Sequence, residues 1–382
     1  MTGFVRLRWS WRVSLAVLLA AAAATASAAA RKVIVDQDAF GPGGSDMQSL
    51  LIALQAPDVE VLGITITSGD GWRDEEVAHT LRLLEEARRT DVKVYPGAVY
   101  PLINTPQRTR EWEKLYGRLV FKGAWTEVWP ANENRRSPYH ADPYLIPPLA
   151  EGPPTTHAAA ESAASFMIRM VHAYPGQVTI LALGPLTNVA LAARLDPQFA
   201  SLAKELVFMG GSFNPVPSGD AFADEYVNAP RLEFNMHWDA EAASLVLHES
   251  WHKITQIPVD PTTATLFTPE NIRQVGRGTA PFDPYLGKWG QPFPMWDELA
   301  VAVWLDPTLV TRSTTVMEDV DVSFTAGYGN TLSWAPNVAP QLGEAQVNVA
   351  LAVDVPRFEQ MALALLSHPK AAAPPQTGLA IQ

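Results

Sequence analysis

The stretch "IVDQDAFGPGGSD", residues 34–46, sets the pattern of strand, turn and helix on which the fold prediction rests. Its apolar start predicts a short buried strand. After the glycine-rich turn, "SDMQSLLIALQAPD" has the helical spacing of Met47, Leu50, Leu51 and Leu54. A strand that passes through a tight turn into an amphipathic helix is typical of proteins that alternate the two elements.

The same alternation continues along the chain. "VEVLGITITSGD" and "VKVYPG" predict two further strands, and "WRDEEVAHTLRLLEEARRT" between them predicts a helix. This order indicates an α/β fold with a mostly parallel, Rossmann-like central sheet flanked by helices. Ligands bind such sheets at the carboxyl ends of the strands. Asp38 and Asp70 follow two of the predicted strands directly, so we expect both at a ligand site.

The remainder of the chain gives two predictions about its organisation. "VTILAL", "ELVFMGG", "VDVSFTA" and "VNVALAVD" predict later strands. Residues 103–155 are rich in proline, tryptophan and charge, which predicts a long, irregular, lid-like loop. Because no repeat and no linker interrupts the pattern, we predict one domain over residues 31–382.

The first thirty residues are typical of a cleavable secretory signal. Arg6, Arg8 and Arg12 precede the apolar run "VSLAVLLAAAAATA" and a group of small residues. We therefore expect a periplasmic or secreted protein with no membrane association after cleavage.

The formal net charge of −12 disfavours a nucleic acid polymer as partner, because phosphates would be repelled. The chain has no cysteine, which excludes disulfides and thiolate metal sites.

The aspartates around the first turn allow two interpretations. Asp38 and Asp46 could bind one hard cation, since calcium takes several oxygen ligands. Alternatively, Ser45 and Gln48 have the spacing of a capping box, and Asp46 suits the first turn of a helix. The local sequence leaves both interpretations open.

Five motifs in a fixed order decide between them. The segments "DQD…SD", "LALGPLTNVALAARLDP", "ELVFMGGSF", "EFNMHWDAEAA" and "WDELAVAVWLDP" resemble those of the inosine-uridine nucleoside hydrolase family. The resemblance covers nearly the whole chain after residue 30. It implies a nucleoside hydrolase-like α/β fold, usually dimeric or tetrameric. It also implies a Ca²⁺-dependent enzyme that cleaves the N-glycosidic bond of a small-molecule ribonucleoside.

The resemblance assigns a metal site to four residues. Asp38 matches the first metal-binding aspartate, which in the family also serves as the catalytic general base, and Asp46 matches the last aspartate of the opening motif. Leu183 stands where a backbone carbonyl binds the ion. Asp297, in "WDELA", matches the distant third carboxylate.

The resemblance also assigns ribose contacts. Glu233 and Asn235 in "EFN" match the ribose-binding pair, and Asn228 matches an upstream asparagine, with Asn214 as its rival. Ser45 replaces an aspartate that contacts a ribose hydroxyl in the family. Met209 resembles a ribose-pocket methionine but suits packing equally well, and we assign it no role.

Three residues point to a purine base. Trp296 stands where the purine-preferring branch has a tryptophan, and Trp112, in "REWEK", resembles its second stacking tryptophan. Asp70 matches an aspartate of the same branch and is assigned to substrate contact.

The opening motif also supports a second hypothesis. Ser45 lacks the charge of the aspartate that the family has at this position, and the first turn is longer than in the family. The protein would then be an exported nucleoside- or sugar-binding protein with little or no turnover.

Overall fold

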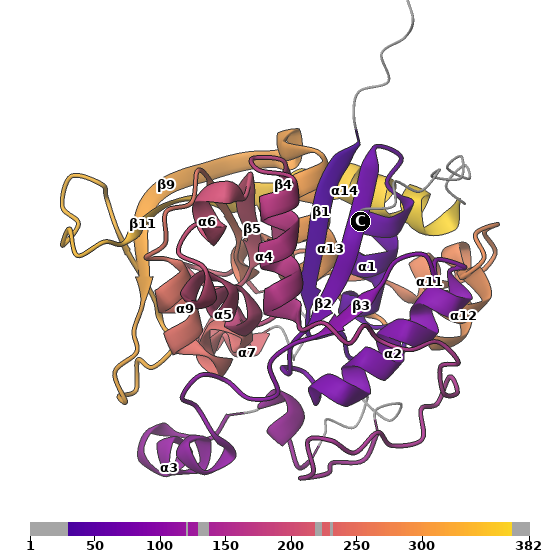
Figure 1. The fold of residues 1–382 in the computed structure, drawn as a ribbon, viewed down its shortest axis with the longest axis horizontal. Helices are drawn as coiled ribbons and strands as arrows, with labels where there is room; N and C mark the ends of the chain where they lie inside the picture. The colour runs from indigo at the N-terminus through magenta and orange to yellow at the C-terminus, as the bar shows by residue number, and fades with distance from the viewer. Residues whose placement is uncertain (1–29, 120, 129–136, 218–223, 230–231, 369–382) are drawn as a thin grey trace, which may run out of the picture. The chain divides into compact units, whose positions relative to one another are not determined.

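The strands predicted from the sequence around residues 34–97 lie side by side in one central sheet. The computed structural model describes residues 30–119, 121–128, 137–217, 224–229 and 232–368. Within these ranges nine strands form one sheet in the order β10-β9-β11-β6-β5-β4-β1-β2-β3 (Figure 1). The strands of this sheet are β1 Arg31–Gln37, β2 Val59–Ile66, β3 Val94–Pro96, β4 Val178–Ala182, β5 Glu205–Met209, β6 Ile254–Ile257, β9 Val310–Val320, β10 Thr331–Trp334 and β11 Ala345–Val353.

Most neighbours in this sheet are parallel. Among the nine strands of this sheet, β9 runs opposite to the other eight, so that it is antiparallel to its neighbours β10 and β11, and all other neighbouring pairs are parallel. The predicted α/β class with a mostly parallel sheet is therefore confirmed. A separate antiparallel pair is formed by β7 Leu266–Phe267 and β8 Phe293–Pro294.

Both faces of the sheet are buried at its centre, which explains why β4 and β5 are mostly apolar. In β1, Val33 and Val35 belong to one hydrophobic core and Ile34 belongs to the other. The first core is completed by α1 Ser45–Gln55, α13 Trp296–Leu305 and α14 Val355–Ser367. The second is completed by α4 Ala163–Ala173, α5 Thr187–Leu195 and α9 Ala240–Val246 (Figure 1).

The remaining described helices also add buried side chains to these two cores, as Val77 and Leu83 do for the first and Met236 does for the second. They are α2 Arg73–Glu86, α3 Pro106–Tyr116, α6 Phe199–Leu202, α7 Asp224–Asn228, α8 Phe234–Trp238, α10 Val259–Thr262, α11 Pro269–Val275 and α12 Asp283–Trp289, with the 3₁₀ turns η1 Gly123–Trp125 and η3 Pro307–Leu309.

Three local predictions need correction. The segment 103–155 is not wholly irregular, because it contains α3, which begins where the Thr105 side chain accepts a hydrogen bond from the Arg108 N–H. The strand predicted from "VDVSFTA" is wrong after Val320, where β9 ends in a turn. The capping box is also wrong: Gly44 is the N-cap of α1 and no side chain caps it.

The predicted secretory signal falls almost entirely on residues 1–29, outside the described part of the chain. The described residues from Arg31 onward belong to one compact unit. Among the described helices, none combines the length and the apolar character needed to cross a bilayer.

Candidate active site

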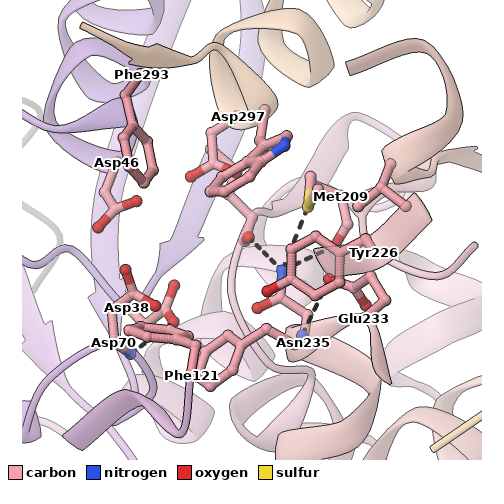
Figure 2. A pocket seen from close by; sticks show the side chains of 14 residues that line it. Asp38, Asp46, Asp70, Phe121, Met209, Tyr226, Glu233, Asn235, Phe293 and Asp297 are labelled. Atoms are coloured by element: carbon pink, nitrogen blue, oxygen red, sulfur yellow. Dashed lines mark hydrogen bonds between the residues drawn. The ribbon is translucent and has the colours of Figure 1, made fainter. Parts of the chain in front are cut away.

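A pocket opens at the carboxyl edge of the parallel strands (Figure 2). The space between its walls is about 480 Å³, including the open solvent at its mouth. Carboxylates and aromatic rings share the lining. The lining residues are Asp38, Asp46, Asp70, Phe121, Leu183, Met209, Tyr226, Glu233, Phe234, Asn235, Val259, Phe293, Trp296 and Asp297.

Strand ends and helix starts supply the acidic part of the lining. Asp38 and Asp70 follow β1 and β2, and Leu183 follows β4. Asp46 and Asp297 lie in the first turns of α1 and α13, where the helix dipole favours negative charge. The fold therefore brings Asp297 to the amino-terminal turn, as the resemblance implied.

Asp38 is held tightly by its neighbours. The Asp70 N–H donates to its Oδ2 at 3.0 Å. Gly69 and Gly184 lie so close to the carboxylate that an added Cβ would come within 2.0 Å of Oδ2 and 2.4 Å of Oδ1 respectively. Both positions therefore require glycine, and the Asp38 carboxylate has little freedom to turn.

The other two predicted metal carboxylates also accept a hydrogen bond at one oxygen. The Phe40 N–H donates to Asp46 Oδ2 at 2.9 Å. The Gln37 side-chain amide donates to Asp297 Oδ2 at 2.7 Å. Each carboxylate is thus oriented by a neutral donor while it lines the pocket (Figure 2).

The electrostatic environment of these acids is unfavourable for their charged forms. Burial raises the pKa of Asp38 well above its usual range, and repulsion from Asp70 and Asp46 adds to the effect. Burial likewise raises the pKa of Asp297, although the hydrogen bond from Gln37 opposes the rise. A bound divalent cation would favour both carboxylates.

Glu233 and Asn235 lie together on the lining. Glu233 is the N-cap of α8 and accepts hydrogen bonds from the backbone N–H groups of Gly211 at 2.8 Å and of Asn235 and Met236 at 3.1 Å. Burial nevertheless raises the pKa of Glu233 to about 7. Polar atoms of both residues therefore lie where a sugar hydroxyl could bind.

The Asn235 side chain also reaches the predicted metal-binding carbonyl. Its amide donates to Leu183 O at 2.9 Å and to Met209 O at 3.1 Å. A carbonyl oxygen has two lone pairs, so the bond from Asn235 leaves Leu183 O with a second acceptor position.

Aromatic rings form the rest of the lining. Trp296 packs edge-on against Phe293, with ring centroids 5.1 Å apart, and against Tyr226 at 6.1 Å. Phe121 and Phe234 pack together at 4.8 Å. Trp296 thus lies on the wall of the pocket, and its stacking on a base remains a prediction.

Trp112 lies outside the lining, and the contact predicted for it needs correction. It is 2% exposed, its indole N–H donates to Thr325 O at 2.7 Å, and its ring packs edge-on against His237. Because α3 turns this side chain into the protein, Trp112 has a packing role here. Phe121, from the same long segment, lines the pocket instead.

Ser45 does not line the pocket either. Its buried hydroxyl donates to Glu298 Oε2 at 2.5 Å and accepts from the Asp297 N–H at 3.2 Å. The predicted contact with ribose is therefore corrected to a link between the starts of α1 and α13. Burial raises the pKa of Glu298 to about 8, and the bond from Ser45 opposes the rise.

The two candidate asparagines of the upstream loop are also outside the lining. Asn228, at the end of α7, and Asn214 are both exposed. Tyr226, two residues before Asn228, lines the pocket in their place. The ribose contact predicted for Asn228 is thus not supported by its position.

Sequence reasoning missed several lining residues. Phe234 lies inside the "EFN" motif and Met209 matches a family methionine, so a signal for these two existed. Phe121, Tyr226 and Phe293 lie in segments with no periodic pattern and carried no such signal.

The donor types suit a hard divalent cation. Three carboxylates, from Asp38, Asp46 and Asp297, and the Leu183 carbonyl supply only oxygen, as calcium prefers. Among the described residues, however, no group of three or more such side chains is already close enough to hold an ion. The chemistry of the donors therefore fits a hard divalent cation, and their present separation is wider than that of a formed metal site.

Comparison with known proteins gives the family. Residues 33–360 match the family described as inosine-uridine preferring nucleoside hydrolase. Uridine nucleosidase 1 of Arabidopsis thaliana is 33% identical over 64% of this chain, an alignment that spans only 61% of that protein. The inosine-uridine preferring nucleoside hydrolase of Leishmania major is 26% identical, over 86% of this chain and 95% of that protein.

A solved structure agrees with these sequence relatives. The purine-preferring ribonucleoside hydrolase from Gardnerella vaginalis superposes with a TM-score of 0.64 at 25% identity, over 88% of this chain and 98% of that chain. The chain therefore belongs to the inosine-uridine preferring nucleoside hydrolase family, whose members are glycosidases that act on N-ribosyl bonds.

Proposed function

We propose that this protein is a Ca²⁺-dependent hydrolase that releases the base, preferably a purine, from a ribonucleoside. One observation carries the proposal: a single pocket combines oxygen donors at the strand ends with the aromatic rings of Trp296, Phe121 and Phe293. The oxygen donors suit a cation and a sugar, whereas the rings suit a flat base.

The residues divide the reaction between them. N-ribosyl cleavage passes through an oxocarbenium-like state, as other glycoside cleavages do. Asp38, fixed between two glycines, is the base that takes the proton from the attacking water. Glu233 and Asn235 bind ribose hydroxyls. Asp38, Asp46, Asp297 and the Leu183 carbonyl would hold the Ca²⁺ ion. When bound, the ion would orient the sugar and the water and make the water more acidic.

The preference for a purine rests on the aromatic lining. A larger base gains more from stacking on Trp296, at about 1–3 kcal/mol per contact. The purine-preferring relative from Gardnerella vaginalis supports this choice. The similarity to a plant uridine nucleosidase supports uridine as the alternative. Initial rates with inosine, guanosine, adenosine, uridine and cytidine decide between the two.

We also propose that the protein is exported and assembles as a dimer or tetramer. The arginines and apolar run of residues 1–30 support export, and the family resemblance supports assembly. Cell fractionation and light scattering of the purified protein test these two points separately.

Release of reducing sugar from inosine tests the activity directly. The purified chain is stripped with a chelator, assayed, and assayed again after Ca²⁺ is restored. We expect activity to fall at least a hundredfold on stripping and to return with Ca²⁺. Full activity after stripping would contradict the metal proposal. Calorimetric binding of inosine without any release of sugar would favour the nucleoside-binding hypothesis instead.

A further inference from the structure

We propose that Gln37 is a positioning residue, which sets the orientation of Asp297 relative to Asp38 and so prepares the metal site. The inference rests on the proposed function, because it concerns the carboxylates assigned there to Ca²⁺. The family motif assigns roles to Asp38 and Asp46 but none to the glutamine that precedes Asp38.

The side chain of Gln37 joins the two carboxylate positions directly. Gln37 is the last residue of β1 and is completely buried. Its Oε1 accepts from the Asp38 N–H at 2.9 Å, and its Nε2 donates to Asp297 Oδ2 at 2.7 Å. Asp297 is 260 positions away in the sequence. One amide thus connects the end of β1 with the first turn of α13.

The same amide also touches the helix that carries Asp46. Gln37 Nε2 approaches Ser49 Oγ at 3.3 Å, and the Ser49 hydroxyl donates to the Asp46 backbone carbonyl at 2.7 Å. Gln37 therefore lies at the junction of β1, α1 and α13. These three elements position Asp38, Asp46 and Asp297 respectively.

An amide suits this position for a chemical reason. It offers an acceptor for the Asp38 N–H and donors for Asp297 without carrying charge. A lysine or arginine would neutralise Asp297 and repel a divalent cation, whereas an apolar side chain would leave Asp297 Oδ2 buried without its donor. Partners of this kind, behind the metal ligands, typically contribute 10–100-fold to metal affinity.

The test is a calorimetric titration of Ca²⁺ into chelator-stripped protein without substrate. Gln37→Met keeps the length and burial of the side chain but removes both hydrogen-bonding groups. We expect Ca²⁺ affinity to fall at least about tenfold. A crystal structure of the variant should show the Asp297 carboxylate rotated from its present orientation.

Gln256→Met is the matched control. Gln256 is also completely buried, lies in β6, and donates through its amide to a backbone carbonyl, that of Gly210, at 3.0 Å. The substitution should therefore reduce the stability of the fold to a similar extent, and Gln256 does not contact Asp38, Asp46 or Asp297. We expect this variant to lose thermal stability but to bind Ca²⁺ within twofold of wild type.

Gln37→Asn serves if Gln37→Met does not fold. It keeps an amide but is one methylene shorter, so it cannot reach both the Asp38 N–H and Asp297, and we expect it to weaken Ca²⁺ binding at least about fivefold. Wild-type affinity in either folded variant would overturn the role of Gln37 and leave the proposed function intact. Absence of Ca²⁺ binding in the wild type would overturn the proposed function, and this inference with it.

Discussion

The side chains that line the pocket come from two kinds of region, the central sheet with its adjoining helices and the parts of the chain outside it. The carboxyl edge of the sheet, with the first turns of α1 and α13, supplies Asp38, Asp46, Asp70 and Asp297. The parts of the chain outside the central sheet supply Phe121 of a long connecting segment, Tyr226 of the short helix α7 and Phe293 of the two-residue strand β8. The acids follow from the strand and helix pattern, whereas the positions of these three rings depend on the path of the chain outside the central sheet.

This difference suggests a division of labour. The acids lie on rigid, regular elements, which suits a reaction that requires fixed geometry. Phe121 lies on a long connecting segment, which can change length and path without disturbing the sheet, whereas Trp296 lies on α13 next to Asp297. We therefore expect the acids to control the rate and the rings to control which base is accepted.

The largest expected effect comes from Asp38→Asn, which keeps the shape of the side chain but removes the base. We expect kcat to fall at least about a thousandfold. Thermal unfolding should occur at no lower temperature than in the wild type, because the variant no longer buries a charge. Asp297→Asn should also abolish turnover.

Asp58→Asn is the control for both variants. The Asp58 side chain is 55% exposed and pairs with Arg31, and the residue is outside the pocket lining. Its activity should stay within twofold of wild type. Substantial turnover by Asp38→Asn or Asp297→Asn would end the claim that the acidic region controls the rate.

The second prediction concerns a buried acid outside the pocket. Burial raises the pKa of Asp239 to about 6 despite hydrogen bonds from Thr187 and the Leu102 N–H. The folded protein therefore holds this proton up to a higher pH than the unfolded chain does. The stability that Asp239 contributes is fully present below its unfolded pKa of 3.8 and is lost as the pH rises through about 6.

Urea unfolding at pH 4 and pH 7, with chelator present, measures this effect. Between the two pH values, wild type should lose up to roughly 3 kcal/mol more unfolding free energy than Asp239→Asn. Equal losses in the two proteins would show that burial does not shift this acid. The result shows how far burial, with a small contribution from Glu241, shifts the pKa of an acid outside the pocket.

The third prediction tests the stacking of a base on Trp296. Trp296→Ala should lower kcat/KM for inosine by about 5–150-fold, since stacking contributes about 1–3 kcal/mol, and should lower it less for uridine. Trp112→Phe is the control: it should reduce stability while leaving kcat/KM for both substrates within twofold. Equal losses for inosine and uridine in Trp296→Ala would remove the stacking argument.

The smallest expected effect comes from Ser45→Ala. It removes the hydrogen bonds to Glu298 and from the Asp297 N–H, so the free energy of unfolding should fall by about 1 kcal/mol. KM should change little, because Ser45 does not line the pocket. A large rise in KM with unchanged stability would restore the ribose contact first predicted for Ser45.

The sequence predicts a functional residue correctly where that residue adjoins a strand or helix with a clear hydrophobic pattern. Asp38 and Asp70 end apolar strands, and Asp46 begins an amphipathic helix, so their places at the edge of the sheet could be predicted. Asp297 needed the family motif, because no local pattern connects it with the end of β1, where Gln37 lies 260 positions earlier. The parallel sheet follows from alternation alone.

The failures share one physical cause. Trp112 and Phe121 lie on the same long segment, yet only Phe121 lines the pocket. The direction of each ring depends on tertiary contacts, such as the bond from Trp112 to Thr325 O. The roles of Ser45 and Gln37 likewise depend on partners in α13, which local sequence cannot supply.

The two glycines that flank Asp38 have a consequence for protein engineering. Even an alanine at position 69 or 184 would collide with the Asp38 carboxylate, so directed evolution has no room to adjust the catalytic base from its flanks. Libraries that aim at a new nucleobase should therefore keep both glycines and diversify position 121, where a change of ring alters the pocket wall without displacing the sheet.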